Sequence, residues 1–117
     1  MSAEEVSEII NPEISTIKDA ARTIGRALMN LEEAHVELAM SRLHGAFLTT
    51  NPDWNTIWGR FIVNIVGGPD KELPPSIRTP EFVGALKAVE GTVNRTPLTI
   101  RKHLFEDFRR IVSRHRI

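Results

Sequence analysis

Residues 12–48 read PEISTIKDAARTIGRALMNLEEAHVELAMSRLHGAFL and form the longest periodic stretch of the chain. Apolar positions recur at intervals of three and four residues, the heptad spacing of helices that pack against a partner helix. The positions on this line are Ile14, Ile17, Ala21, Ile24, Leu28, Leu31, His35 and Leu38. The pattern predicts one helix from about Pro12 to about Leu48, roughly 54 Å long at 1.5 Å per residue.

A helix of that length is too long to be covered by the rest of a 117-residue chain. We therefore expect a second copy, or another helical protein, to pack along it. His35 falls on the heptad line, where a buried polar residue sets the register of a dimer. The apolar positions shift beyond His35, and Gly45 leaves the continuity of the last turns open. The residues expected at the self-association surface are Ile17, Ile24, Ala27, Leu28, Leu31, His35 and Leu38.

Four copies of one local signal predict where helices begin. Asn or Thr accepts hydrogen bonds from the first turn of a helix, and proline suits the first helical position. The copies are Asn11-Pro12, Asn51-Pro52, Thr79-Pro80 and Thr96-Pro97. They predict the long helix and three shorter ones, which start at Pro52, Pro80 and Pro97. We expect Gly67 to end the second helix and Gly91 to end or fray the third.

The fold class predicted from these patterns is all-α, a helical bundle of four main helices in a single domain over residues 1–117. Residues 1–11 are expected to be a frayed acidic end, and residues 67–78 a polar loop. No segment alternates as a strand does, so no sheet is expected.

Composition narrows the class of protein. The chain has no cysteine, which excludes disulfides, a thiolate nucleophile and cysteine zinc sites. Its start is acidic and lacks the apolar core of a secretory signal, and its longest apolar stretch, residues 61–66, is far shorter than a membrane span of roughly 20 residues. We expect a cytoplasmic protein.

Charge is distributed unevenly although the total is zero. Residues 1–40 carry three basic and eight acidic side chains, or −5, whereas residues 95–117 carry seven basic and two acidic ones, or +5. Such asymmetry indicates either a polyanionic partner at the basic end or head-to-tail attraction between subunits.

The basic C-terminal helix is the main candidate site, because arginine and lysine side chains bind phosphate groups. Alternatives are a solvated face with pairs such as Lys102–Glu106, and a helix-turn-helix, for which the spacer after Gly91 is longer than the usual turn. The residues expected to bind nucleic acid are Arg95, Thr99, Arg101, Lys102, Arg109, Arg110 and Arg116.

Two shorter patterns suggest chemistry. Arg110-x4-His115 resembles the Arg-x4–6-His signature of HEPN-type helical ribonucleases, which implies that His115 is a general base and that Arg110 stabilises phosphorane charge. Ile111 stands where that family usually has a polar residue. Glu32-x-x-His35 is half of the paired motif that builds di-iron sites in helix bundles. With a single copy present, we predict no metal site.

These features lead to three hypotheses. The first is a non-enzymatic helical subunit that self-associates or joins a larger assembly and contacts DNA or RNA backbone through its C-terminal helix. In its size, helicity and basic face, the chain resembles the small all-α subunits of CRISPR effector complexes. The second is a protein-interaction or scaffold module of a phage, plasmid or secretion assembly, and the third is a HEPN-like ribonuclease. No cofactor, small-molecule substrate or membrane contact is expected.

Overall fold

The computed structural model describes residues 16–116, and in that range the chain forms five α-helices, two short 3₁₀ helices and no strand. The first helix covers residues 16–27. The others are α2 (Glu33–Phe47), α3 (Trp54–Val66), α4 (Pro80–Arg95) and α5 (Arg101–His115), with η1 (Pro75–Ile77) before α4 and η2 (Leu98–Ile100) before α5. The all-α class is confirmed, and there is one helix more than predicted. No described helix is long and apolar enough to cross a bilayer.

The prediction of one continuous helix over residues 12–48 is wrong, and this accounts for the additional helix. The chain turns at residues 28–32, and α2 starts afresh at Glu33. An unbroken helix would satisfy the carbonyl groups of this segment internally. Instead, the Ser76 hydroxyl donates to the Ala27 carbonyl at 2.7 Å, and the Arg116 guanidinium donates to the carbonyls of Leu28 and Leu31 at 3.3 and 2.9 Å. The break is therefore capped by residues far along the chain.

Folding the long segment in two covers its apolar stripe with the chain's own helices. Ile17, Ile24 and Leu28 are fully buried in the core. Gly25 permits a close approach to α5, since a Cβ added there would lie only 2.7 Å from the Val112 carbonyl oxygen. Ile17, Ile24 and Leu28 are therefore covered within one chain, and no second copy is needed to bury them.

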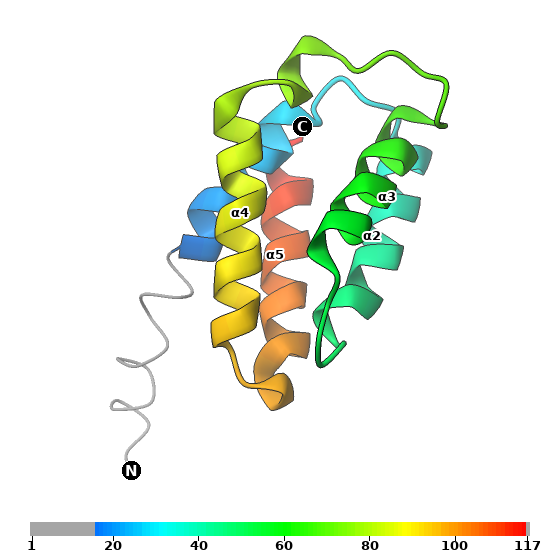
Figure 1. Ribbon diagram of the computed structural model, residues 1–117. Helices are drawn as coiled ribbons and strands as arrows, with labels where there is room; N and C mark the ends of the chain where they lie inside the picture. The colour runs from blue at the N-terminus through cyan, green and yellow to red at the C-terminus, as the bar shows by residue number, and fades with distance from the viewer. Residues whose placement is uncertain (1–15, 117) are drawn as a thin grey trace.

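The α2–α3 hairpin and α4 lie on opposite sides of α5 in Figure 1. Trp54 and Trp58 lie four residues apart on α3 and are both buried in the core, and each also donates a hydrogen bond to a side chain of α4. The Trp58 indole N–H donates to the Glu90 carboxylate at 2.7 Å, and that of Trp54 donates to the Asn94 side-chain oxygen at 3.0 Å. These bonds satisfy the polar end of each ring while its apolar body fills the core.

Gly67 ends α3, as predicted, with a left-handed φ of 92°. A Cβ at this position would lie 2.6 Å from the His35 ring, so the space beside the glycine is also needed. The expected polar loop at 67–78 contains η1. Gly91 does not end α4, which continues to Arg95, so that expectation is wrong.

The helix-start signals had mixed outcomes. Thr79-Pro80 begins α4 as predicted, with the Thr79 hydroxyl accepting from the Phe82 N–H. The cap of α3 is Asp53 instead of Asn51, because the Asp53 carboxylate accepts from the Thr56 N–H. Asn11-Pro12 lies outside the described residues.

Thr96-Pro97 does not begin α5. The Thr96 hydroxyl donates backward to the Thr92 carbonyl at 2.7 Å, so this residue ends α4. The chain then passes through η2, and α5 starts at Arg101. Thr96 therefore caps the C-terminal end of α4 and not the N-terminal end of α5.

Candidate functional sites on α5 and in the α2–α3 groove

Arg101, one of the predicted phosphate-binding residues, is a structural side chain. It is 7% exposed, its Nε donates to the Thr96 carbonyl at 3.0 Å, and its Nη1 donates to the Thr49 carbonyl at 2.8 Å. Those carbonyls lie just beyond the C-terminal ends of α4 and α2, where helix dipoles favour a cation. The guanidinium ties three chain segments together, and its burial does not fit a role in phosphate binding.

Arg116 has a similar role at the opposite end of α5. It is half-buried, and its hydrogen bonds to the carbonyls of Leu28 and Leu31 close the break between the first helix and α2. Two of the seven predicted residues therefore direct their donors to the chain's own backbone.

The exposed face of α5 carries four cations: Lys102, Arg109, Arg110 and Arg114. Arg114 was missed in the sequence, although it shares this face. Arg109 forms an ion pair with Glu37 of α2 at 3.4 Å, and Arg110 forms one with Asp107 at 2.7 Å. Within residues 16–116, Lys102 and Arg114 have no carboxylate within ion-pair distance.

The remaining two of the seven residues predicted to bind nucleic acid, Arg95 and Thr99, precede α5 in the chain. Arg95 is the last residue of α4 and Thr99 lies in η2, and both are exposed. Neither belongs to α5, so they are not part of the group of cations on its outer face.

The seven residues expected at a self-association surface do not share one face. Ile17, Ile24 and Leu28 are fully buried, while Ala27 and Leu31 are partly buried against the core. His35 is partly exposed beside Gly67, with its Nδ1 3.6 Å from the Glu32 carboxylate. Leu38 alone of the seven is largely exposed, at 45%. Self-association of the protein stays a prediction.

In the described part of the chain, each of the two chemical patterns consists of its own two residues and gathers no third member. Arg110 and His115 are five residues apart on one helix, so their side chains point about 140° apart around its axis. Arg110 is bound to Asp107, and His115 packs beside Gly25. No group of three or more His, Asp and Glu side chains gathers as a metal site among residues 16–116, so Glu32 and His35 remain an isolated pair.

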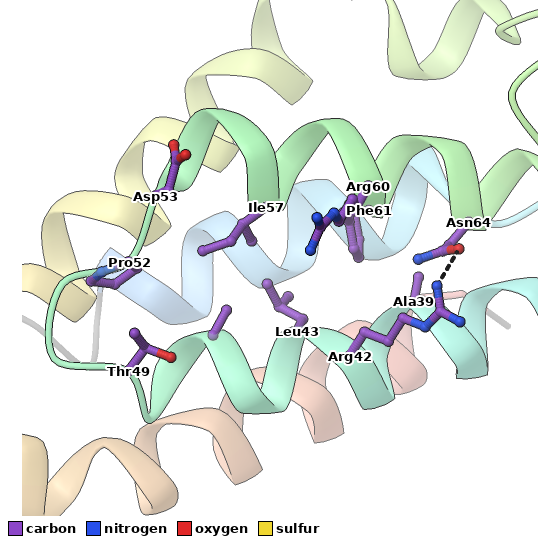
Figure 2. Close-up of a pocket in the computed structure, with 11 residues that line it drawn as sticks. Ala39, Arg42, Leu43, Thr49, Pro52, Asp53, Ile57, Arg60, Phe61 and Asn64 are labelled. Carbon is purple, nitrogen blue, oxygen red and sulfur yellow. Dashed lines mark hydrogen bonds between the residues drawn. The ribbon is translucent and has the colours of Figure 1, made fainter.

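A groove of about 460 Å³ lies between α2 and α3 (Figure 2). Its floor is apolar and its rim is polar. The residues around it are Ala39, Arg42, Leu43, Ala46, Thr49, Pro52, Asp53, Ile57, Arg60, Phe61 and Asn64. The volume falls within the range of small-molecule binding pockets, roughly 300 to 1,000 Å³.

Charge is distributed unevenly along this groove. Figure 2 shows Asp53 and Thr49 at one end, and Arg42 and Asn64 at the other, with Arg60 between the two ends. The Arg42 Nη1 donates to the neutral side-chain amide of Asn64 at 3.3 Å. Hydrogen bonds from the hydroxyl and the backbone N–H of Thr56 hold the pKa of Asp53 below its usual value, and Arg60 contributes a smaller effect in the same direction.

The groove was not recognised in the sequence. Arg42 and Arg60 are 18 positions apart, each at the edge of an otherwise ordinary amphipathic helix. Only the pairing of α2 with α3 brings them to the same groove. Their types and spacing alone contain no signal that could have found the site.

No family model matches this chain, and no curated protein or solved structure matches it either.

Proposed function

We propose that this protein is a non-enzymatic cytoplasmic binding subunit that contacts the phosphate backbone of nucleic acid through the exposed face of α5. The observation that carries the proposal is the set of four exposed cations on α5, Lys102, Arg109, Arg110 and Arg114. They are spread over about 18 Å along the helix axis and about 140° around it. The opposite face of α5 is buried in the core, which holds the cations on a rigid support.

The number of available cations sets the expected strength of binding. If Lys102 and Arg114 alone contact phosphates, the logarithm of affinity should fall with the logarithm of salt concentration with a slope of about −1.8 for a duplex. If Arg109 and Arg110 exchange their carboxylates for phosphates, the slope should approach about −3.6. All seven basic side chains of residues 95–117 would require about −6. Affinity should therefore be modest and independent of base sequence.

Fluorescence anisotropy with labelled single-stranded and duplex DNA and RNA at several salt concentrations tests this proposal. The double variant Lys102→Gln/Arg114→Gln should weaken binding to every sequence and flatten the slope by about 1.8. The matched control Lys71→Gln/Arg78→Gln removes the same charge from exposed positions outside α5 and should change the slope little. Equal effects of the two double variants, or no binding near 50 mM salt, would rule out the α5 interface.

A second candidate function is a protein-assembly module that uses the outer face of α2. Exposed side chains follow one another there at intervals of four and three residues, the spacing of a helix–helix seam. They are Ala34, Leu38, Ser41, Gly45 and Leu48, of which Leu38 and Leu48 are 45% and 42% exposed.

Sedimentation of wild type and Leu38→Asp would test this second candidate. We expect a concentration-dependent dimer for the wild type and a monomer with unchanged helicity for the variant. A wild type that remains monomeric at tens of micromolar would remove self-association from consideration.

A further inference from the structure

We propose that the groove between α2 and α3 is a docking site for an acidic amphipathic peptide segment of a partner protein. An apolar side chain of the segment fills the floor, and flanking Asp or Glu side chains pair with Arg42 and Arg60. This inference does not depend on the α5 interface, because α5 contributes no residue to the groove.

The floor and the rim of the groove differ in polarity and in exposure. Leu43 and Phe61 on the floor are buried, whereas Arg42, Asp53 and Arg60 at the rim are exposed. Ala39 and Ala46 on α2 face Ile57 and Phe61 on α3, and the small alanine side chains leave the apolar volume unfilled. A bulky aliphatic or aromatic side chain that enters this space would remove apolar surface from water, the main source of affinity in helix-in-groove recognition.

The two arginines of the groove also differ from Arg109 and Arg110 of α5 in what they contact. Arg42 contacts a neutral amide, and neither Arg42 nor Arg60 has a carboxylate within ion-pair distance among residues 16–116. On α5, by contrast, Arg109 and Arg110 are both paired with carboxylates. The guanidinium groups of the groove are therefore available to a carboxylate supplied by a partner, with the bidentate geometry that arginine favours.

The charges along the groove favour one orientation of the segment. Asp53 at one end of the groove repels an acidic group, while Arg60 in the middle and Arg42 at the other end attract it (Figure 2). The acidic part of the segment should therefore lie near Asn64 and its apolar part near Ile57. A bare phosphate backbone offers nothing to fill the apolar floor, and an uncharged apolar ligand leaves both arginines unused. An acidic amphipathic segment satisfies both parts of the site.

The test uses the full chain and a fluorescein-labelled peptide of about twelve residues, with Leu and Phe at helical spacing between Glu and Asp. We expect measurable binding by anisotropy. Affinity should fall about three- to tenfold for Arg42→Gln/Arg60→Gln, as the loss of two exposed ion pairs implies. Ala46→Glu, which places a carboxylate inside the groove, should cause a similar loss. A peptide with Gln and Asn in place of Glu and Asp should bind as weakly to wild type as the acidic peptide binds to the double variant.

Two sets of controls identify the site and its occupant. Arg26→Gln/Arg78→Gln removes two exposed cations elsewhere and should change peptide affinity less than twofold, as should Lys102→Gln/Arg114→Gln on α5. Equal losses in all three double variants would overturn the proposal, as would no peptide binding at all. Displacement of the peptide by decanoate, or by oligothymidylate in a manner that requires Arg42 and Arg60, would also overturn it, in favour of a small carboxylate ligand or nucleic acid.

Discussion

The exposed face of α5 and the α2–α3 groove differ in how strongly the sequence suggests them and in what the fold leaves available. Residues 101–116 contain six basic side chains, yet two of them bind backbone carbonyls and two are paired with carboxylates. The groove has only two arginines, and both face an unfilled apolar space without a carboxylate partner among the described residues.

The comparison teaches that a count of basic residues does not measure a binding surface. A guanidinium group has five donors, and a helix end has carbonyl groups without partners. When the chain places one beside the other, the arginine becomes part of the scaffold. Burial and hydrogen-bond partners therefore decide which of the cations can meet a ligand.

The largest effect is expected for Arg101→Met, which tests the structural role of this arginine. The change removes two hydrogen bonds from a charged donor and leaves the carbonyls of Thr49 and Thr96 without that donor, which should destabilise the fold by about 2 to 3 kcal/mol. Urea denaturation followed by tryptophan fluorescence measures the change. Lys102→Met, the exposed neighbour, is the control and should stay within about 0.5 kcal/mol of wild type. Comparable stability of the two variants would show that the bonds of Arg101 contribute little.

A smaller effect is expected for Arg116→Met, because this side chain is only half-buried. The loss of its bonds to the carbonyls of Leu28 and Leu31 should cost about 1 kcal/mol and loosen the turn at residues 28–32. Amide hydrogen exchange should show faster exchange at this turn while α3 stays protected. Exchange that accelerates uniformly along the chain would contradict a local capping role.

Glu37→Gln sharpens the comparison from the α5 side. The carboxylate of Glu37 lies 3.4 Å from Arg109 and competes with any phosphate for that guanidinium. Its removal should strengthen nucleic-acid binding about two- to threefold at low salt and steepen the salt slope by up to about 0.9. Anisotropy titrations measure both quantities. Glu72→Gln, an exposed loop change of equal charge, is the control. An equal gain in the control would mean that net charge alone causes the effect.

The smallest effect concerns the acidic end of the groove. Because the Thr56 hydrogen bonds lower the pKa of Asp53 in the folded state, its contribution to stability is present above about pH 4 and is lost as the pH falls through the folded-state pKa. NMR titration of the side-chain carboxyl carbon should give a pKa below the usual value. Thr56→Val should raise that pKa more than Arg60→Gln does. The opposite order would make Arg60 the main influence on this end of the groove.

Much of the fold follows from local patterns. Phe82, Leu86, Val89 and Val93 recur in the sequence at intervals of four, three and four residues, and all four are buried on α4. On α3, Trp54 and Trp58 lie four residues apart and are both buried, and Gly67 ends the helix as expected. Such patterns match the structure because helical periodicity, side-chain caps and a left-handed glycine act over a few neighbouring residues.

The break at residues 28–32 was the main failure. A weak local signal existed, since the apolar positions move from the line of Leu28 and Leu31 to that of Val36 and Met40. The heptad spacing continued through His35 and Leu38 and obscured this shift. The groove was missed in the sequence for a different reason, because the two helix edges that form it are not related by any spacing along the chain.

The amino-acid sequence by itself therefore determined the helical class, the polarity of most helix faces, the start of α4 and the end of α3, because these depend on neighbours within about two turns. The tertiary structure alone decided that the long N-terminal segment bends, because the carbonyls freed at the bend are capped by Ser76 and Arg116, which lie 49 and 88 or 85 residues away from their acceptors. It also decided which cations remain available to a ligand. The bend and the availability of the cations both depend on long-range hydrogen bonds and on helix pairing, which no local sequence pattern contains.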